Sequence, residues 1–279
     1  MIPRIDLHIH STYSDGIKTP AEILDIVRDL GLAAFALCDH DNFGAYFEAK
    51  QLLRNGDPEL IPGVELSAGR SGEDIHILGY LFDPNSETLI DALEHFRKVR
   101  NQRGELMLEK LKNLGVDISL DLVKEIAGQS AIGRPHIADA MVRMKVIRGF
   151  DEAFERYIGL NGPAYIPKAN LTPREAIELI HKANGLAILA HPSIADAAKH
   201  IEEFIGYGLD GIEVYHPYHT DNQRKRFSKL VSSRTILGSG GSDYHGRDGR
   251  YGMIGSMPVP PEYLTAMKTI HNSKNRGPS

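Results

Sequence analysis

Short apolar segments alternate with amphipathic helical patterns along most of this chain, and this alternation constrains its fold more than any other feature. Repeated strand–helix units predict parallel strands joined by right-handed crossovers, as in an α/β barrel. Active sites of such barrels lie at the carboxyl ends of the strands. The segments that predict strands are Ile5–Ile9, Leu32–Leu37, Leu60–Glu65, Ile75–Leu81, Leu186–Ala190, Gly211–Tyr215 and Thr235–Gly238.

Two of the predicted helices begin with the same signal. Thr19-Pro20 and Thr172-Pro173 each place a capping threonine before a proline, and a glutamate follows three residues after the threonine. The threonine and the glutamate together form a capping box, and proline is favoured in the first helical turn. Both segments are therefore predicted to be helix N-termini.

The rhythm of the sequence changes between residues 87 and 157, where the pattern is mostly helical and is interrupted only near residues 115–118. Apolar residues there recur with a period near that of an α-helix. We therefore expect a helical insertion that divides the barrel. The predicted boundaries are residues 1–99 for the first part of the barrel, 100–165 for the insertion and 166–279 for the second part.

Composition excludes several classes of protein. The net charge of −5, from 32 basic and 37 acidic residues, argues against a protein that coats duplex DNA. Cys38 is the single cysteine, so no intrachain disulfide is possible and a reducing compartment is expected. No apolar stretch approaches the roughly 20 residues of a membrane span, and the first residues lack the apolar region of a secretory signal. We expect a cytoplasmic protein without membrane contact.

Side chains that bind metals stand at or near the ends of almost every predicted strand. His8 and His10 are two residues apart in a strand, so both imidazoles face the same side. Other histidines and carboxylates follow later strands, flanked by Gly, Pro or Ser. The candidate ligands are His8, His10, Asp15, His40, Glu65, His76, His191, Asp243 and His245.

So many ligands exceed the need of one ion and predict two or three divalent ions that share bridging carboxylates. The set contains no sulfur. Imidazole with carboxylate suits Mn²⁺, Zn²⁺ or Fe²⁺, whereas Mg²⁺ is less well matched to so many imidazoles. Closely spaced divalent ions activate water and neutralise phosphoryl charge, so this ligand set favours hydrolysis of phosphate esters.

The motifs that carry these ligands resemble those of the polymerase and histidinol phosphatase (PHP) superfamily, over about residues 4–82 and 165–260. The resemblance implies a distorted (β/α)7 barrel, similar to a TIM barrel, with a site for up to three metal ions. The motifs are, in order, Asp6-Leu7-His8-Ile9-His10-Ser11 with Ser14-Asp15-Gly16, Asp39-His40-Asp41, Gly63-Val64-Glu65, His191-Pro192 and Ser242-Asp243-Tyr244-His245.

The resemblance also implies a ligand set for each ion and a substrate class. Asp15, where histidinol phosphatases often carry histidine, and the helical insertion are most similar to one branch of the superfamily. That branch hydrolyses nucleoside 3′,5′-bisphosphates and short 5′-phosphorylated oligonucleotides. The implied positions are His8, His10, Glu65 and Asp243 for the first ion, Asp15, His40 and His245 for the second, and Glu65, His76 and His191 for the third. If the third ion is not bound, His76 and His191 contact phosphate instead.

Cations in the insertion predict phosphate contacts, because guanidinium groups bind phosphate in a bidentate manner. Arg97, Arg100 and Arg103 share one helical face, which either contacts substrate or is simply solvated. The turn Gly133-Arg134-Pro135-His136 interrupts two helical patterns and would aim its polar side chains into a cleft. The predicted substrate-binding residues are Arg134, His136, Arg100, Arg103 and Lys168.

Several other polar residues are expected to lie beside the metal site or to have a structural role. Glu213 is expected to orient a ligand from outside the metal site. His216 and His219 either line the rim of the site or have a structural role. Cys38 is expected to be a buried structural thiol rather than a nucleophile.

The predicted reaction is hydrolysis of a phosphate monoester, most specifically the 3′-phosphate of a nucleoside 3′,5′-bisphosphate, and also of the 5′ ends of short oligoribonucleotides. A hydroxide bridging two metal ions would attack phosphorus, Arg134 would stabilise the developing charge, and His191 or His245 would protonate the leaving oxygen. A histidinol-phosphate or sugar-phosphate phosphatase is the first alternative. A non-catalytic PHP domain that only binds metal is the second, and the sequence does not predict an oligomeric state.

Overall fold

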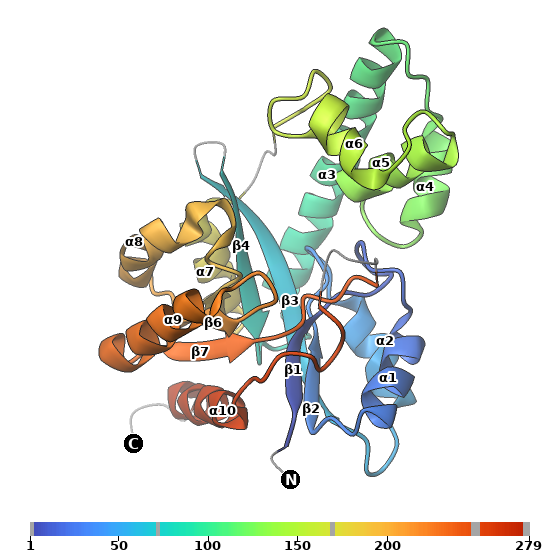
Figure 1. Cartoon of the computed structure of the whole chain (residues 1–279). Coiled ribbons are helices and arrows are strands. Elements are labelled where there is room, and N and C mark those ends of the chain that lie inside the picture. Colours follow the sequence, from blue (N-terminus) through green and yellow to red (C-terminus); the bar gives the residue numbers. More distant parts are fainter. Residues whose placement is uncertain (1–2, 71–72, 168–170, 247–251, 276–279) are drawn as a thin grey trace. The chain divides into compact units, whose positions relative to one another are not determined.

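The computed structural model describes residues 3–70, 73–167, 171–246 and 252–275 (Figure 1). The chain divides into two compact units. Residues 1–91 and 171–279 form the first, and residues 92–170 form the second. The predicted insertion of residues 100–165 lies within the second unit. Among the described residues, no helix is long and apolar enough to cross a membrane.

One sheet organises the first unit, and its strands follow one another in chain order. The seven strands in the described part of the chain are β1 (Ile5–Ile9), β2 (Ala34–Leu37), β3 (Glu59–Arg70), β4 (Glu73–Tyr80), β5 (Leu186–Leu189), β6 (Gly211–Tyr215) and β7 (Leu237–Gly240). The predicted α/β barrel of the PHP type is confirmed as a nearly closed barrel of these strands.

The expectation of parallel strands throughout is wrong at β4. This strand runs antiparallel to both β3 and β5, whereas the neighbouring pairs β1–β2, β2–β3, β5–β6 and β6–β7 are parallel. The reason lies in the connection, because β3 ends at Arg70 and β4 begins at Glu73. A parallel crossover needs about a dozen residues or more, so a link this short can only form a hairpin.

The barrel closes between β1 and the segment that follows β7. Ile9 forms a parallel bridge with Tyr244, and the backbone N–H of His10 donates to the Tyr244 oxygen at 2.9 Å. The buried carboxylate of Asp6 accepts backbone hydrogen bonds from Ser242 at 2.9 Å and Gly255 at 2.8 Å. These contacts connect the two ends of the sheet through one side chain.

Helices pack outside this sheet, and α1 and α7 begin at the two predicted capping boxes. The helix α2 was not predicted, because its N-cap, Phe43, provides no side-chain hydrogen bond and gives no start signal. Figure 1 shows α1 and α2 beside β1 and β2, and α10 beside β7. The bounds are α1 (Pro20–Asp29), α2 (Gly44–Leu52), α7 (Pro173–Lys182), η2 (Ile194–His200, a 3-10 helix), α8 (Ile201–Gly206), α9 (Asp221–Arg234) and α10 (Pro261–Asn275).

The second unit has its own apolar core, built from short helices. Met107, Leu111, Val123, Ile137 and Met141 are buried there together. The helix α3 begins in the first unit and continues into the second. The elements are α3 (Glu87–Asn113), α4 (Leu120–Ala127), α5 (Arg134–Arg143), α6 (Phe150–Ala153) and η1 (Phe154–Ile158, a π-helix).

Asp210, which precedes β6, connects three elements of the first unit. Its carboxylate accepts from the backbone N–H of Ala187 in β5 and contacts His181 Nε2 in α7, both at 2.8 Å. Lys274 in α10 donates to its other oxygen. Burial alone would raise the pKa of Asp210, but these bonds lower it below its usual value of 3.8.

We predict that Asp210→Asn lowers the free energy of unfolding by about 1–3 kcal/mol at pH 7, because hydrogen bonds to a charged acceptor are lost. A depressed pKa stabilises the folded state fully above the unfolded pKa, and this contribution disappears as pH falls through the folded value. The difference between wild type and variant should therefore shrink below the usual pKa of 3.8. Urea unfolding at pH 7 and at a series of acidic pH values measures it.

The control is Asp117→Asn, which removes a carboxylate that is 75% exposed and lies 3.8 Å from the ammonium of Lys112, itself 68% exposed. Exposed ion pairs of this kind contribute roughly 0–1 kcal/mol. Equal losses in the two variants at pH 7 would contradict the role of Asp210.

Candidate metal centre

The metal-type side chains predicted from the sequence converge at one end of the barrel. His8 lies in β1 and His10 follows the last residue of β1, two positions further along the extended chain; neither ring is exposed. Their Nε2 atoms are 3.1 Å apart. The chain after β7 passes close to the backbone of β1 here. A Cβ on Gly241 would lie only 2.3 Å from the backbone nitrogen of His8. A glycine is therefore required where this segment passes β1.

Four of these side chains form a first group: His8, His10, Glu65 and Asp243. The facing atoms are the two Nε2 atoms, Glu65 Oε2 and Asp243 Oδ1. Five of their six separations lie between 3.1 and 3.4 Å. Ligand atoms bound at about 2.0 Å to one tetrahedral ion lie roughly 3.3 Å apart. The separations in this group therefore match the corners of one ion's coordination shell.

A second group shares His10 and adds Asp15, His40 and His245. Asp15 Oδ1 lies 3.3 Å from His245 Nε2, 3.8 Å from His10 Nδ1 and 3.9 Å from His40 Nε2. His245 Nδ1 contacts the backbone oxygen of Asp243 at 2.9 Å. A carbonyl oxygen only accepts, so Nδ1 donates in this contact, and Nε2 is the ring nitrogen that faces Asp15.

A third group consists of His40, Glu65 and His76. His76 Nδ1 is 2.9 Å from Glu65 Oε1, and His40 Nδ1 is 3.3 Å from Glu65 Oε2. Neither nitrogen is aligned for a hydrogen bond with any described residue, although both atoms are buried. Buried ring nitrogens without such partners are costly unless another ligand satisfies them. His191 lies beside this group, with Nε2 at 3.0 Å from Glu65 Oε1.

Backbone strain is concentrated around the same groups. His191 and Asp243 have positive φ angles of 25° and 49°, and so does Asp41, with 51°. Such conformations cost energy in residues other than glycine and persist where the surroundings hold them. Hydrogen bonds fix two of these residues. The backbone N–H of His191 donates to Glu213 Oε2 at 2.8 Å, and Asp41 Oδ1 accepts from the backbone N–H of Ser67 at 2.7 Å.

Further side chains surround the three groups and contact their members. The other oxygen of Glu213, Oε1, contacts His8 Nδ1 at 3.0 Å, which agrees with its expected orienting position. His216 Nε2 lies 3.2 Å from Asp243 Oδ2, and its side chain is fully buried. The sequence left His216 between a rim position and a structural role. Its place directly after β6 was the signal for a position near the site.

His219 is buried beside His216 but contacts the backbone rather than a ligand group. Its Nδ1 donates to the Val214 backbone oxygen at 2.9 Å. Burial lowers the pKa of His219 to about 4, so the ring is neutral. Cys38 is fully buried, and burial raises the pKa of its thiol, as a structural cysteine requires.

The electrostatics of the groups suit cations. Burial alone would raise the pKa of Glu65, but the charges of His40, His76 and His8 lower it well below its usual range. Despite their burial, the pKa values of Asp15 and Asp243 are also well below their usual range, because neighbouring histidines, His245 among them, favour the ionised carboxylates. Burial alone would lower the pKa of His10, but Asp243 and Glu65 raise it to about 10. The carboxylates therefore stay ionised, and in the protein alone only imidazolium compensates them.

The predicted substrate-binding residues that the structure describes lie in the second unit. The guanidinium groups of Arg103 and Arg134 both lie 5.9 Å from the Tyr165 ring. Arg100 approaches the residue before Arg134, since a Cβ on Gly133 would be 3.3 Å from Arg100 Nη2. His136 accepts from the Gly133 N–H at 3.0 Å and so caps α5. Lys168 lies outside the described residues.

Comparisons with known proteins agree with this geometry. The PHP domain profile matches residues 6–214. A 5′-3′ exoribonuclease of Haemophilus influenzae is 33% identical over 250 residues, which cover 88% of this chain and 91% of that protein. A 3′,5′-nucleoside bisphosphate phosphatase of Chromobacterium violaceum is 30% identical over 254 residues, covering 88% and 89%.

A solved structure from Bifidobacterium adolescentis, assigned to the metal-dependent phosphoesterases, superposes with a TM-score of 0.87. Its sequence is 28% identical, and the match covers 96% of each chain. The profile match spans well over half of this chain, and the relatives align along nearly all of it. The chain therefore belongs to the PHP domain family of metal-dependent phosphoesterases.

Proposed function

We propose that this protein hydrolyses the 3′-phosphate of nucleoside 3′,5′-bisphosphates and also cleaves at the 5′ ends of short oligoribonucleotides. The observation that carries the proposal is the first ligand group, in which four donor atoms stand at the separations of a single coordination shell. The substrate class is supported by the activities named for the two relatives of Haemophilus and Chromobacterium.

The donor sets fit divalent ions, and we assign one ion to each of the first two groups. His8, His10, Glu65 and Asp243 hold the first, and Asp15, His40 and His245 hold the second, with His10 shared at their border. A third ion would be held by the third group, His40, Glu65 and His76. The mixture of imidazole and carboxylate favours Mn²⁺, Zn²⁺ or Fe²⁺.

Bound divalent ions would supply an acidified water and would neutralise charge on the phosphoryl oxygens. The side chains of the protein do the rest. His245 has both ring nitrogens engaged, at Asp243 O and Asp15 Oδ1, so it acts as a ligand. His191 stands outside the three ligand groups. We therefore assign to His191 Nε2 the proton that the leaving oxygen receives.

The rival functions differ in what they require of the chain. A non-catalytic domain has no need of a complete donor set, yet all nine predicted ligands lie at this end of the barrel. A histidinol-phosphate or sugar-phosphate phosphatase needs one phosphate contact. The three arginines Arg100, Arg103 and Arg134 of the second unit suit a substrate with a second phosphate.

We predict that a chelator abolishes hydrolysis of a nucleoside 3′,5′-bisphosphate and that Mn²⁺ restores it. Asp243→Asn and His8→Ala should each lower kcat at least ~100-fold and reduce the bound metal, because each removes a corner of the first group. Phosphate release and elemental analysis measure the two effects. His95→Ala, which changes an exposed helical histidine, is the control.

Activity that survives complete metal removal would contradict the metal centre. The substrate assignment has its own test, in which the bisphosphate is compared with a nucleoside monophosphate and with histidinol phosphate. If the bisphosphate is turned over no faster than the two monoesters, the substrate assignment is wrong, but the proposed metal centre is not contradicted.

We predict that Glu213→Gln weakens metal binding about 10–100-fold, the usual cost of losing a group that orients a ligand. The amide keeps the shape of the side chain but loses the charge that faces His8 Nδ1. Calorimetric titration of metal into the chelated protein measures the affinity. Glu178→Gln changes an exposed glutamate on α7 and should leave it unchanged. Equal affinities in all three proteins would contradict the role of Glu213.

We predict that Arg134→Ala raises KM about 10–100-fold for a nucleoside 3′,5′-bisphosphate and less than threefold for a nucleoside monophosphate. The loss corresponds to one charge-assisted contact with the second phosphate. Arg143→Ala is the matched control, since Arg143 lies on the same helix, α5, and pairs with the exposed Glu125 at 2.8 Å. Equal effects of Arg134→Ala on both substrates would exclude this contact.

A further inference from the structure

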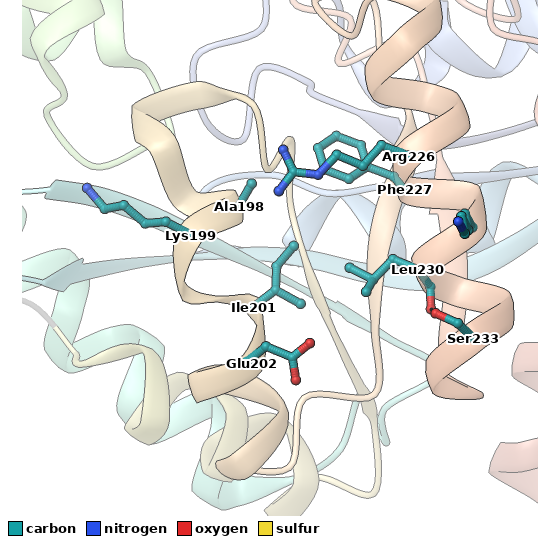
Figure 2. A pocket seen from close by; sticks show the side chains of 9 residues that line it. Ala198, Lys199, Ile201, Glu202, Arg226, Phe227, Leu230 and Ser233 are labelled. Atoms are coloured by element: carbon teal, nitrogen blue, oxygen red, sulfur yellow. The ribbon is translucent and has the colours of Figure 1, made fainter.

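A groove of about 460 Å³ runs along the first unit between the η2–α8 segment and α9. Its floor is apolar and includes Ile201, Phe227 and Leu230. In Figure 2, Arg226 extends from α9 towards the η2–α8 side, where Ala198 lies. None of the residues that line this groove belongs to the metal centre.

The walls of the groove carry an excess of positive charge. Lys199, Arg226 and Lys229 line it and are exposed, and Arg226 and Lys229 have no ion pair with any described residue. Lys199 pairs with Glu73, outside the groove. The one acidic lining residue, Glu202, is compensated by Arg234 at 2.7 Å. The groove therefore offers two uncompensated cations.

This charge is local and does not follow from overall composition. The protein carries a net charge of −5. The helix α9, with the sequence DNQRKRFSKLVSSR, has five basic residues and only one acidic residue. A cationic helix on an acidic protein indicates an anionic ligand rather than a generally basic surface.

The two elements that border the groove begin close to metal-centre residues in the sequence. The segment η2 begins three residues after His191, and α9 begins five residues after His216, which contacts Asp243. Both bordering elements thus leave the same end of the barrel, from the strands β5 and β6. The helix α9 has 14 residues, so its axis extends about 21 Å away from that end.

We propose that this groove binds the phosphodiester backbone of a single-stranded oligonucleotide whose 5′ end lies in the metal centre. The inference rests on the proposed function, and it adds a path for the nucleotides beyond the first. Arg226 and Lys229 contact successive phosphates, and the apolar floor contacts sugars or bases, as in other channels for single strands.

The test compares substrates of different length in the charge-reversed variant R226E/K229E. The KM for a 5′-phosphorylated tetranucleotide should rise at least ~10-fold, whereas the KM for a nucleoside 3′,5′-bisphosphate should change less than twofold. The slope of log K against log salt for tetranucleotide binding should fall by about 1.4, since each lost phosphate contact removes about 0.7. Fluorescence anisotropy in the presence of a chelator measures that binding without turnover.

The control variant is K225E, which reverses one charge at an exposed position of α9 that does not line the groove, and it is compared with the single variant R226E. An effect of K225E equal to that of R226E would show a general field effect and overturn the groove. The proposal would also be overturned if R226E/K229E changed the KM of both substrates equally, or changed neither. Anisotropy reports on the groove even if no nucleotide is hydrolysed, which separates its failure from that of the proposed function.

Discussion

The carboxylate of Glu65 is the interaction on which the rest of the site depends. One oxygen faces His8, His10 and His40, and the other faces His76 and His191. A buried carboxylate needs compensating charge or hydrogen bonds, and here imidazoles from four different strands or strand ends provide it. The barrel can therefore be regarded as a frame that brings five histidines to one glutamate. Loss of register at any one of these strands would remove one or two of the five partners of Glu65.

Much of this arrangement was predictable, because parallel strands place their carboxyl ends together. The ligands in or after β1, β2, β5 and β7 follow from that rule. The common side of His8 and His10 follows from the alternation of side chains along an extended chain. The capping boxes at Thr19 and Thr172 fixed two helix starts in the same way. Such local signals are strong because a single backbone hydrogen-bond pattern decides them.

The main departure from the predicted pattern is the reversed strand β4. His76 is not at a strand end, yet it reaches Glu65, because an antiparallel strand brings its first half to the metal side of the barrel. His76 was among the predicted ligands, but a rule that looks for ligands after strands does not explain its position. The buried place of His216 was undecided for a related reason, since only its contact with Asp243 distinguishes it from a rim histidine. Tertiary contacts of this kind leave no periodic trace in sequence.

The order in which the ligands occur along the chain has a consequence for biosynthesis. His8 leaves the ribosome long before His245, and the two regions meet only when Asp6 accepts the hydrogen bond from Ser242. A nascent chain therefore holds unpaired imidazoles and carboxylates until the segment after β7 has been made. A chain that lacks this segment cannot complete the first two ligand groups.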